Sequence, residues 1–74
     1  MNCIVKFIWD GEAERWFSTS EDIPGLILES SSFDVLLHRV KCAAPEMLEL
    51  NRNYTGEIHL SIVTEHIEVL AAAS

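Results

Sequence analysis

The side chains best suited to catalysis or metal binding fall into two small groups. Asp10, Glu12 and Glu14 place three carboxylates in one short stretch, and His38 and Cys42 stand four positions apart. Carboxylates are the usual ligands of Mg²⁺ and Ca²⁺, whereas imidazole and thiolate groups bind zinc. A cation-dependent enzyme and a zinc site are therefore the first possibilities to weigh.

Neither group meets the requirements of its chemistry. Two-metal nucleases need several carboxylates around ions roughly 3.5–4 Å apart, and beyond Asp10 the predicted helix offers only Asp34, at its first turn. The full spacing of a calcium-binding loop is absent from residues 10–14. Zinc would need two more ligands beside His38 and Cys42, and nothing indicates that His59 or His66 converges on them. We expect no catalytic residue, no metal and no cofactor.

Length and composition predict one small domain. A chain of 74 residues has room for a single core, which we place at residues 1–63 with a short C-terminal extension at 64–74. Two cysteines are too few for a disulfide framework, and no signal peptide is recognisable, so we expect a cytoplasmic protein with reduced thiols. The apolar runs fall short of the roughly 18 residues of a membrane span.

The charge of the chain restricts its partners. A net charge of −7 repels a phosphate backbone, because nucleic-acid affinity comes largely from Lys and Arg side chains that displace counterions. We therefore expect no direct binding to nucleic acid and no membrane association. A basic protein suits the charge better.

The first half of the chain reads as three strands. Residues 2–9 and 15–19 form a hairpin around the Asp10-Gly11 turn signal, which places Trp9 opposite Trp16. The Pro24-Gly25 pair makes a second turn, because proline presets φ and glycine accepts positive φ. Residues 26–29 then form the third strand.

A helix and a fourth strand follow. Ser31 is predicted as the N-cap, with Asp34 completing a capping-box variant. The apolar stripe continues in phase past Pro45, which indicates a kink in preference to a break and restart. Alternation over residues 57–63 predicts a fourth strand. Residues 67–69 either continue that strand beyond a bulge or pair with another chain, and the last four residues form a frayed tail.

The order of these elements resembles a known superfamily. The matching residues are Trp9, Asp10, Glu12 and Ala13, then Trp16, then the run Ser20-Glu21-Asp22-Ile23-Pro24-Gly25-Leu26 with Glu29, and finally Pro45, Glu46, Leu48 and Leu50. With this spacing the chain resembles the HicB-like antitoxin domain superfamily, and within it the short bacterial stand-alone domains of unknown function.

That resemblance implies an α+β fold of the order β-β-β-α-β. The sheet would be mainly antiparallel with strand order 3-2-1-4 and one helix on one face, similar to a partial ribonuclease H core. Full HicB antitoxins neutralise a small basic ribonuclease toxin, and they carry a C-terminal DNA-binding segment that does not follow the fourth strand here. DNA binding is therefore not carried over.

Apolar side chains that a single helix cannot cover predict an interaction surface. We expect Ile4, Ile8, Trp9, Trp16 and Ile27 to form a candidate interface, and the chain to pair as a homodimer through the sheet or its outer strands. The function expected is a non-enzymatic interaction domain that neutralises a small basic toxin. The alternative is a stand-alone structural or ligand-sensing domain without a toxin, and a nuclease is the third possibility.

Overall fold

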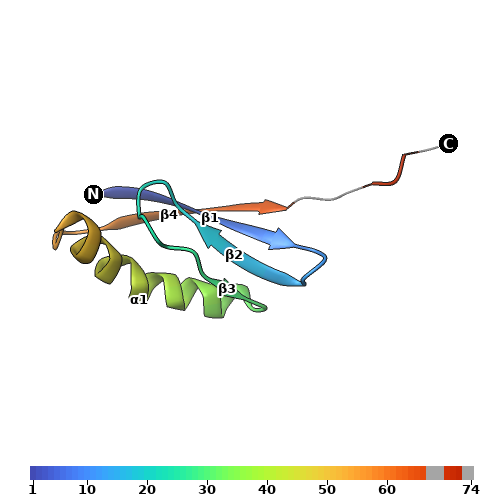
Figure 1. Ribbon diagram of the computed structural model, residues 1–74, viewed down its shortest axis with the longest axis horizontal. Coiled ribbons are helices and arrows are strands. Elements are labelled where there is room, and N and C mark those ends of the chain that lie inside the picture. The colour runs from blue at the N-terminus through green and yellow to red at the C-terminus, as the bar shows by residue number, and fades with distance from the viewer. Residues whose placement is uncertain (67–69, 73–74) are drawn as a thin grey trace.

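The described residues of the protein fold as a four-stranded sheet with one helix on one face (Figure 1). The computed structural model describes residues 1–66 and 70–72. Its elements in chain order are β1 (Asn2–Asp10), β2 (Arg15–Thr19), β3 (Glu29–Ser30), α1 (Phe33–Arg52) and β4 (His59–His66).

The predicted α+β architecture and strand order are confirmed. The sheet has the order β3-β2-β1-β4, with β1–β2 and β2–β3 antiparallel and β1–β4 parallel. The sheet is therefore mixed, and its parallel pair follows from the crossover through α1, because parallel strands cannot be joined by a tight turn.

The two predicted turns are both present. The hairpin places Trp9 directly opposite Trp16, and the carboxylate of Asp10 accepts hydrogen bonds from the amides of Glu12 and Ala13 at 3.1 and 3.3 Å, an Asx-type turn that stabilises the loop after Asp10-Gly11. At the second turn, Gly25 has φ 84°, and the Leu26 amide donates to the Ile23 carbonyl. These features are those of a type II turn around Pro24-Gly25.

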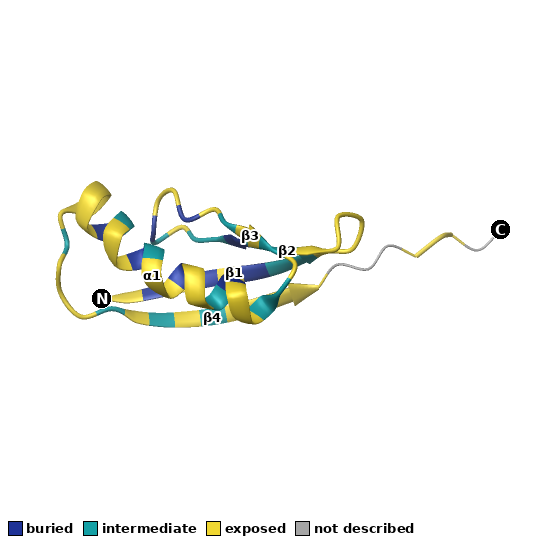
Figure 2. Ribbon diagram, turned by 90° about the horizontal axis from the view of Figure 1, so that it is seen from below, coloured by how far each residue is buried: buried dark blue, intermediate teal, exposed yellow. Residues whose placement is uncertain are grey.

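The core lies between α1 and one face of the sheet. Side chains that are at most 1% exposed come from alternate positions of β1, from β2 and the loop after it, and from one stripe of α1: Cys3, Val5, Phe7, Ser18, Ile23, Leu26, Leu36, Val40, Ala44 and Leu48. Figure 2 shows this alternation of buried and exposed positions along β1 and α1. The predicted periodicities of two and of 3.6 residues are thus both present.

The helix begins one residue later than predicted. Its N-cap is Ser32, not Ser31: the Ser32 hydroxyl accepts from the Val35 amide at 3.3 Å. With this start Phe33 is the first helical residue, and its ring packs edge-on against Phe7 and Trp16. Asp34 still lies in the first turn, where a carboxylate favours the helix dipole.

The third and fourth strands also have other bounds than predicted, whereas the helix continues past Pro45 as predicted. The third strand is Glu29–Ser30 instead of residues 26–29, because residues 26–28 are held mainly by the side chain of Ser18. The helix runs through Pro45 without the restart that was the weaker alternative, and Asn53 caps its C-terminus with φ 54°. The fourth strand starts at His59 and continues to His66, past the predicted end of the core at residue 63.

Part of the predicted C-terminal structure lies outside the described residues. The expected continuation or chain pairing of residues 67–69, and the last two residues of the predicted tail, lie outside the described residues. No helix in the described part of the chain has the length and apolar character needed to cross a membrane.

Candidate functional site

The sheet face opposite α1 carries exposed apolar side chains, among them Ile4 and Val63. On β1 the buried residues alternate with Ile4, Lys6 and Ile8, which must point away from the helix. Residues paired across strands share a face, so the register adds positions from β2 and β4. We call this surface the open face and define it by its central residues: Ile4, Lys6, Ile8, Phe17, Thr19 and Val63.

The centre of the open face is only partly buried. Ile4 is 54% exposed and Val63 is 45% exposed, while Ile8 and Phe17 are half-buried and lie opposite one another in the β1–β2 register. No described segment covers these side chains, and Figure 1 shows the helix on the other side of the sheet.

Carboxylates border this apolar centre. One row across the sheet pairs Glu29 with Phe17, Phe17 with Ile8, and Ile8 with Glu65, so that a glutamate stands at each side of two apolar residues. The Arg15 guanidinium lies 3.6 Å from the Glu29 carboxylate. The open face therefore carries apolar side chains around the central Lys6, and carboxylates at its borders.

One corner of the open face is hollowed. A shallow pocket of about 320 Å³ is lined by Ile4, Lys6, Thr19, Ser20, Glu21 and Asp22. Ser20 donates from its hydroxyl to the Ile4 carbonyl at 2.6 Å, and Asp22 accepts from the Ile4 amide at 2.7 Å. These two side chains extend the hydrogen bonding of β1 beyond the end of β2 and hold the acidic loop 20–22 against the sheet.

The residues predicted as an interface do not share one surface. Ile4 and Ile8 lie on the open face, but Trp9 and Trp16 lie on the helix side, where the Trp9, Trp16 and Phe33 rings are in contact at centroid distances of 5.4 and 5.2 Å. The Trp16 ring packs against the core. Ile27 is 74% exposed and lies in the loop before β3.

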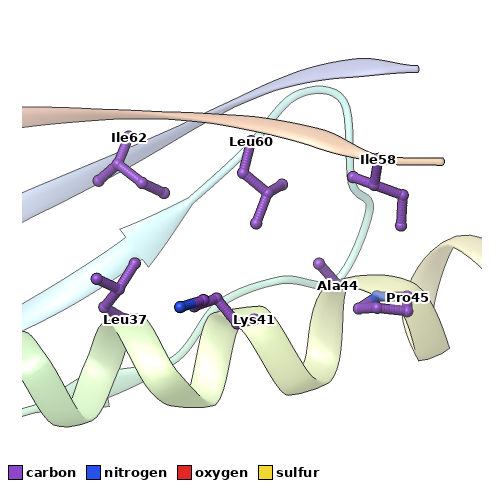
Figure 3. Close-up of a pocket in the computed structure, with 7 residues that line it drawn as sticks. All are labelled: Leu37, Lys41, Ala44, Pro45, Ile58, Leu60 and Ile62. Carbon is purple, nitrogen blue, oxygen red and sulfur yellow. The ribbon is translucent and has the colours of Figure 1, made fainter.

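A second hollow separates α1 from β4. It has a volume of about 380 Å³ and is lined by apolar side chains and one lysine: Leu37, Lys41, Ala44, Pro45, Ile58, Leu60 and Ile62 (Figure 3). Ile58, just before β4, and Leu60 and Ile62 of β4 point toward the helix. The helix leans toward β2 and β3, so it leaves the inner side of β4 half-covered. We call this hollow the α1–β4 groove.

The hairpin carboxylates and the His38–Cys42 pair were the candidates for metal binding or catalysis. In the range of residues that the structure describes, no three His, Cys, Asp or Glu side chains gather closely enough to hold a metal ion. Asp10 serves the hairpin turn, and the Cys42 sulfur lies 3.7 Å from Nε2 of His38 on the exposed side of α1. Burial, reinforced by the charge of Asp22, raises the pKa of the Cys3 thiol, and a raised pKa disfavours the nucleophilic thiolate.

Comparison with known proteins gives a family. The sequence profile described as "Domain of unknown function (DUF1902)" matches residues 2–72. The chain belongs to the DUF1902 family. The crystal structure of the hypothetical protein TTHA1013, from the extremely thermophilic bacterium Thermus thermophilus, is similar to the DUF1902 chain with a TM-score of 0.72 and 32% identity, over 97% of this chain and 100% of that one. Among curated proteins no match was found.

The DUF1902 chain also depends on a residue that the sequence patterns did not single out. Ser18 is fully buried, and its hydroxyl donates to the Leu26 carbonyl at 3.2 Å and accepts from the Leu28 amide at 3.1 Å. It thereby attaches the loop after the Pro24-Gly25 turn to β2. The only sequence signal was its inward position in the period-two pattern of β2. That position alone does not show whether the serine hydroxyl bonds to the backbone of another segment.

Proposed function

We propose that this protein is a HicB-like interaction domain that acts without catalysis, self-associates, and neutralises a small basic ribonuclease toxin through its open face. The observation that supports the proposal best is the arrangement of that face, in which apolar side chains around Lys6 are bordered by Glu29, Glu65 and the acidic loop 20–22.

This arrangement suits a basic protein partner. Apolar side chains at the centre of an interface supply most of the affinity, and charged groups at the rim steer the partner and set its orientation. The chain as a whole carries a net charge of −7, which favours encounter with a positively charged surface at low ionic strength. Binding over the open face would cover the exposed parts of Ile4 and Val63.

The test is inhibition of the toxin by the purified chain. The partner is identified by affinity purification of the tagged chain from its native cells with mass spectrometry, and its ribonuclease activity is titrated with the wild-type chain. We expect stoichiometric inhibition. Ile4→Arg, which inserts a like charge facing a basic partner, should weaken inhibition by about tenfold or more.

Val35→Arg is the matched control, because Val35 is 50% exposed on α1 and far from the open face. It should inhibit as the wild type does. Equal inhibition by the Ile4 variant would contradict the assignment of the open face. Recovery of the chain without a stoichiometric basic protein would instead favour the alternative, a stand-alone structural or ligand-sensing domain.

A further inference from the structure

In the described part of the chain, the outer edge of β4 has neither the proline nor the lysine that often keeps a sheet edge from pairing. In the described part of the chain β4 is the last strand of the sheet on its side. Its eight residues, His-Leu-Ser-Ile-Val-Thr-Glu-His, include no proline and no lysine. Natural edge strands are normally protected by such residues, by bulges or by short length, whereas β3 at the opposite edge has only two residues.

The backbone groups available at this edge follow from the pairing with β1. The His59 amide donates to the Met1 carbonyl, so the N–H and C=O of His59 point toward β1. These directions alternate along a strand. Ser61 and Val63 therefore point toward β1 as well, and Leu60, Ile62 and Thr64 direct their N–H and C=O groups to the outer edge.

One antiparallel register makes this edge complementary to itself. With Ile62 opposite Ile62 of a second copy, the outward groups of Leu60 face those of Thr64, and His59 stands opposite Glu65 on the open side of the sheet. Within one chain the His59 imidazole lies 3.2 Å from the Glu57 carboxylate, and in the dimer it can donate instead to Glu65 of the second copy. A register centred on Ser61 would instead pair His59 with Val63 and leave Glu65 without a strand residue opposite it, because Glu57 precedes β4.

The α1–β4 groove fits the same arrangement. A two-fold axis perpendicular to the sheet keeps both helices on one face, so the open sides of the two grooves meet over the paired β4 strands. Leu60 and Ile62 of each copy then lie beside those of the other copy. This contact would cover apolar side chains that one helix leaves half-exposed, and it enlarges the interface beyond the paired backbones.

We infer that two copies of the chain pair antiparallel through β4, centred on Ile62, to form a continuous eight-stranded sheet with both α1 helices on one face. The inference rests on the self-association included in the proposed function and names its edge, its register and its contacts. It leaves the open face of both copies accessible to a basic partner.

Two charge variants and their mixture test this register. Glu65→Lys places a cation opposite His59 of the second copy, and His59→Glu places a carboxylate opposite Glu65. Each change occurs twice in a symmetric dimer, so each variant should weaken dimerisation on the order of tenfold in sedimentation equilibrium. In an equimolar mixture the heterodimer contains one Glu–Lys pair and one His–Glu pair, so dimerisation should recover.

Glu12→Lys is the matched control, because it makes the same charge change at the exposed hairpin tip and should leave the dimer constant unchanged. If neither β4 variant weakened dimerisation, the β4 register would be wrong, although the chain would still self-associate. The same conclusion would follow if mixing the two variants did not restore dimerisation. A wild-type monomer at micromolar concentration would overturn both. Toxin inhibition is measured separately with the Ile4 variant, so its failure is distinguishable from either result.

Discussion

Ser18 shows how one buried hydroxyl can replace a stretch of regular strand. Its side chain bridges the Leu26 carbonyl and the Leu28 amide, while its own amide donates to the Leu28 carbonyl at 2.8 Å. This arrangement holds the loop that brings Ile23 and Leu26 into the core. Strand periodicity could place Ser18 on the inner face, but it could not indicate the two backbone partners, because they depend on the path of a loop eight to ten residues away.

At the scale of this residue, we predict that Ser18→Ala lowers the free energy of unfolding by about 1–3 kcal/mol, since it leaves buried backbone groups without a partner. Urea denaturation followed by tryptophan fluorescence measures the change. Ser61→Ala, at an exposed position of β4, is the control and should stay within about 0.5 kcal/mol of the wild type. Equal stability of the two variants would argue against a structural role for Ser18.

Among the elements, the helix was the easiest to predict and its first residue the hardest. The apolar stripe from Phe33 to Leu48 requires a long amphipathic helix, and Pro45 does not interrupt its phase. Three consecutive serines precede it, and each is a good N-cap. The choice among them depends on packing of the Phe33 ring against Phe7 and Trp16, which local sequence does not contain.

The helix start therefore provides a test at the scale of the element. Ser32→Ala should destabilise the protein by about 1 kcal/mol, because it removes the acceptor of the Val35 amide. Ser31→Ala should change stability by no more than about 0.5 kcal/mol, since Ser31 is exposed and outside the helix. Thermal unfolding by circular dichroism compares the two. If Ser31→Ala destabilised the protein more than Ser32→Ala, the N-cap would be Ser31.

The strand order of the whole molecule was predictable because the resemblance covered the hairpin, the turn and the helix. The sequence did not allow a prediction of where the helix lies over the sheet. Both faces of β1 carry large apolar residues, so its alternation fits a helix on either side. The lean of α1 toward β2 and β3, which creates the α1–β4 groove, depends on how the segment between Asn53 and Ile58 crosses to β4.

For the molecule as a whole, the inferred dimer makes thermal stability depend on concentration. Dissociation accompanies unfolding, so a tenfold increase in protein concentration should raise Tm by roughly 3–6 °C. Differential scanning calorimetry over a hundredfold concentration range measures this shift. Glu65→Lys should require higher concentration to reach the same Tm, whereas a constant Tm over the range would contradict dimerisation.

The parallel pairing of β1 with β4 has a consequence for how the protein forms during synthesis. It joins residues 2–9 to residues 59–66, so the first strand to leave the ribosome pairs on one side with the last. The hairpin, the Pro24-Gly25 turn and α1 can form from neighbouring segments, but the outer side of β1 stays without a strand until β4 emerges. Because residues 59–66 lie far along the chain from β1, a nascent chain leaves this β1 edge unpaired until they have been translated, and the β4 edge for a second copy arises only then.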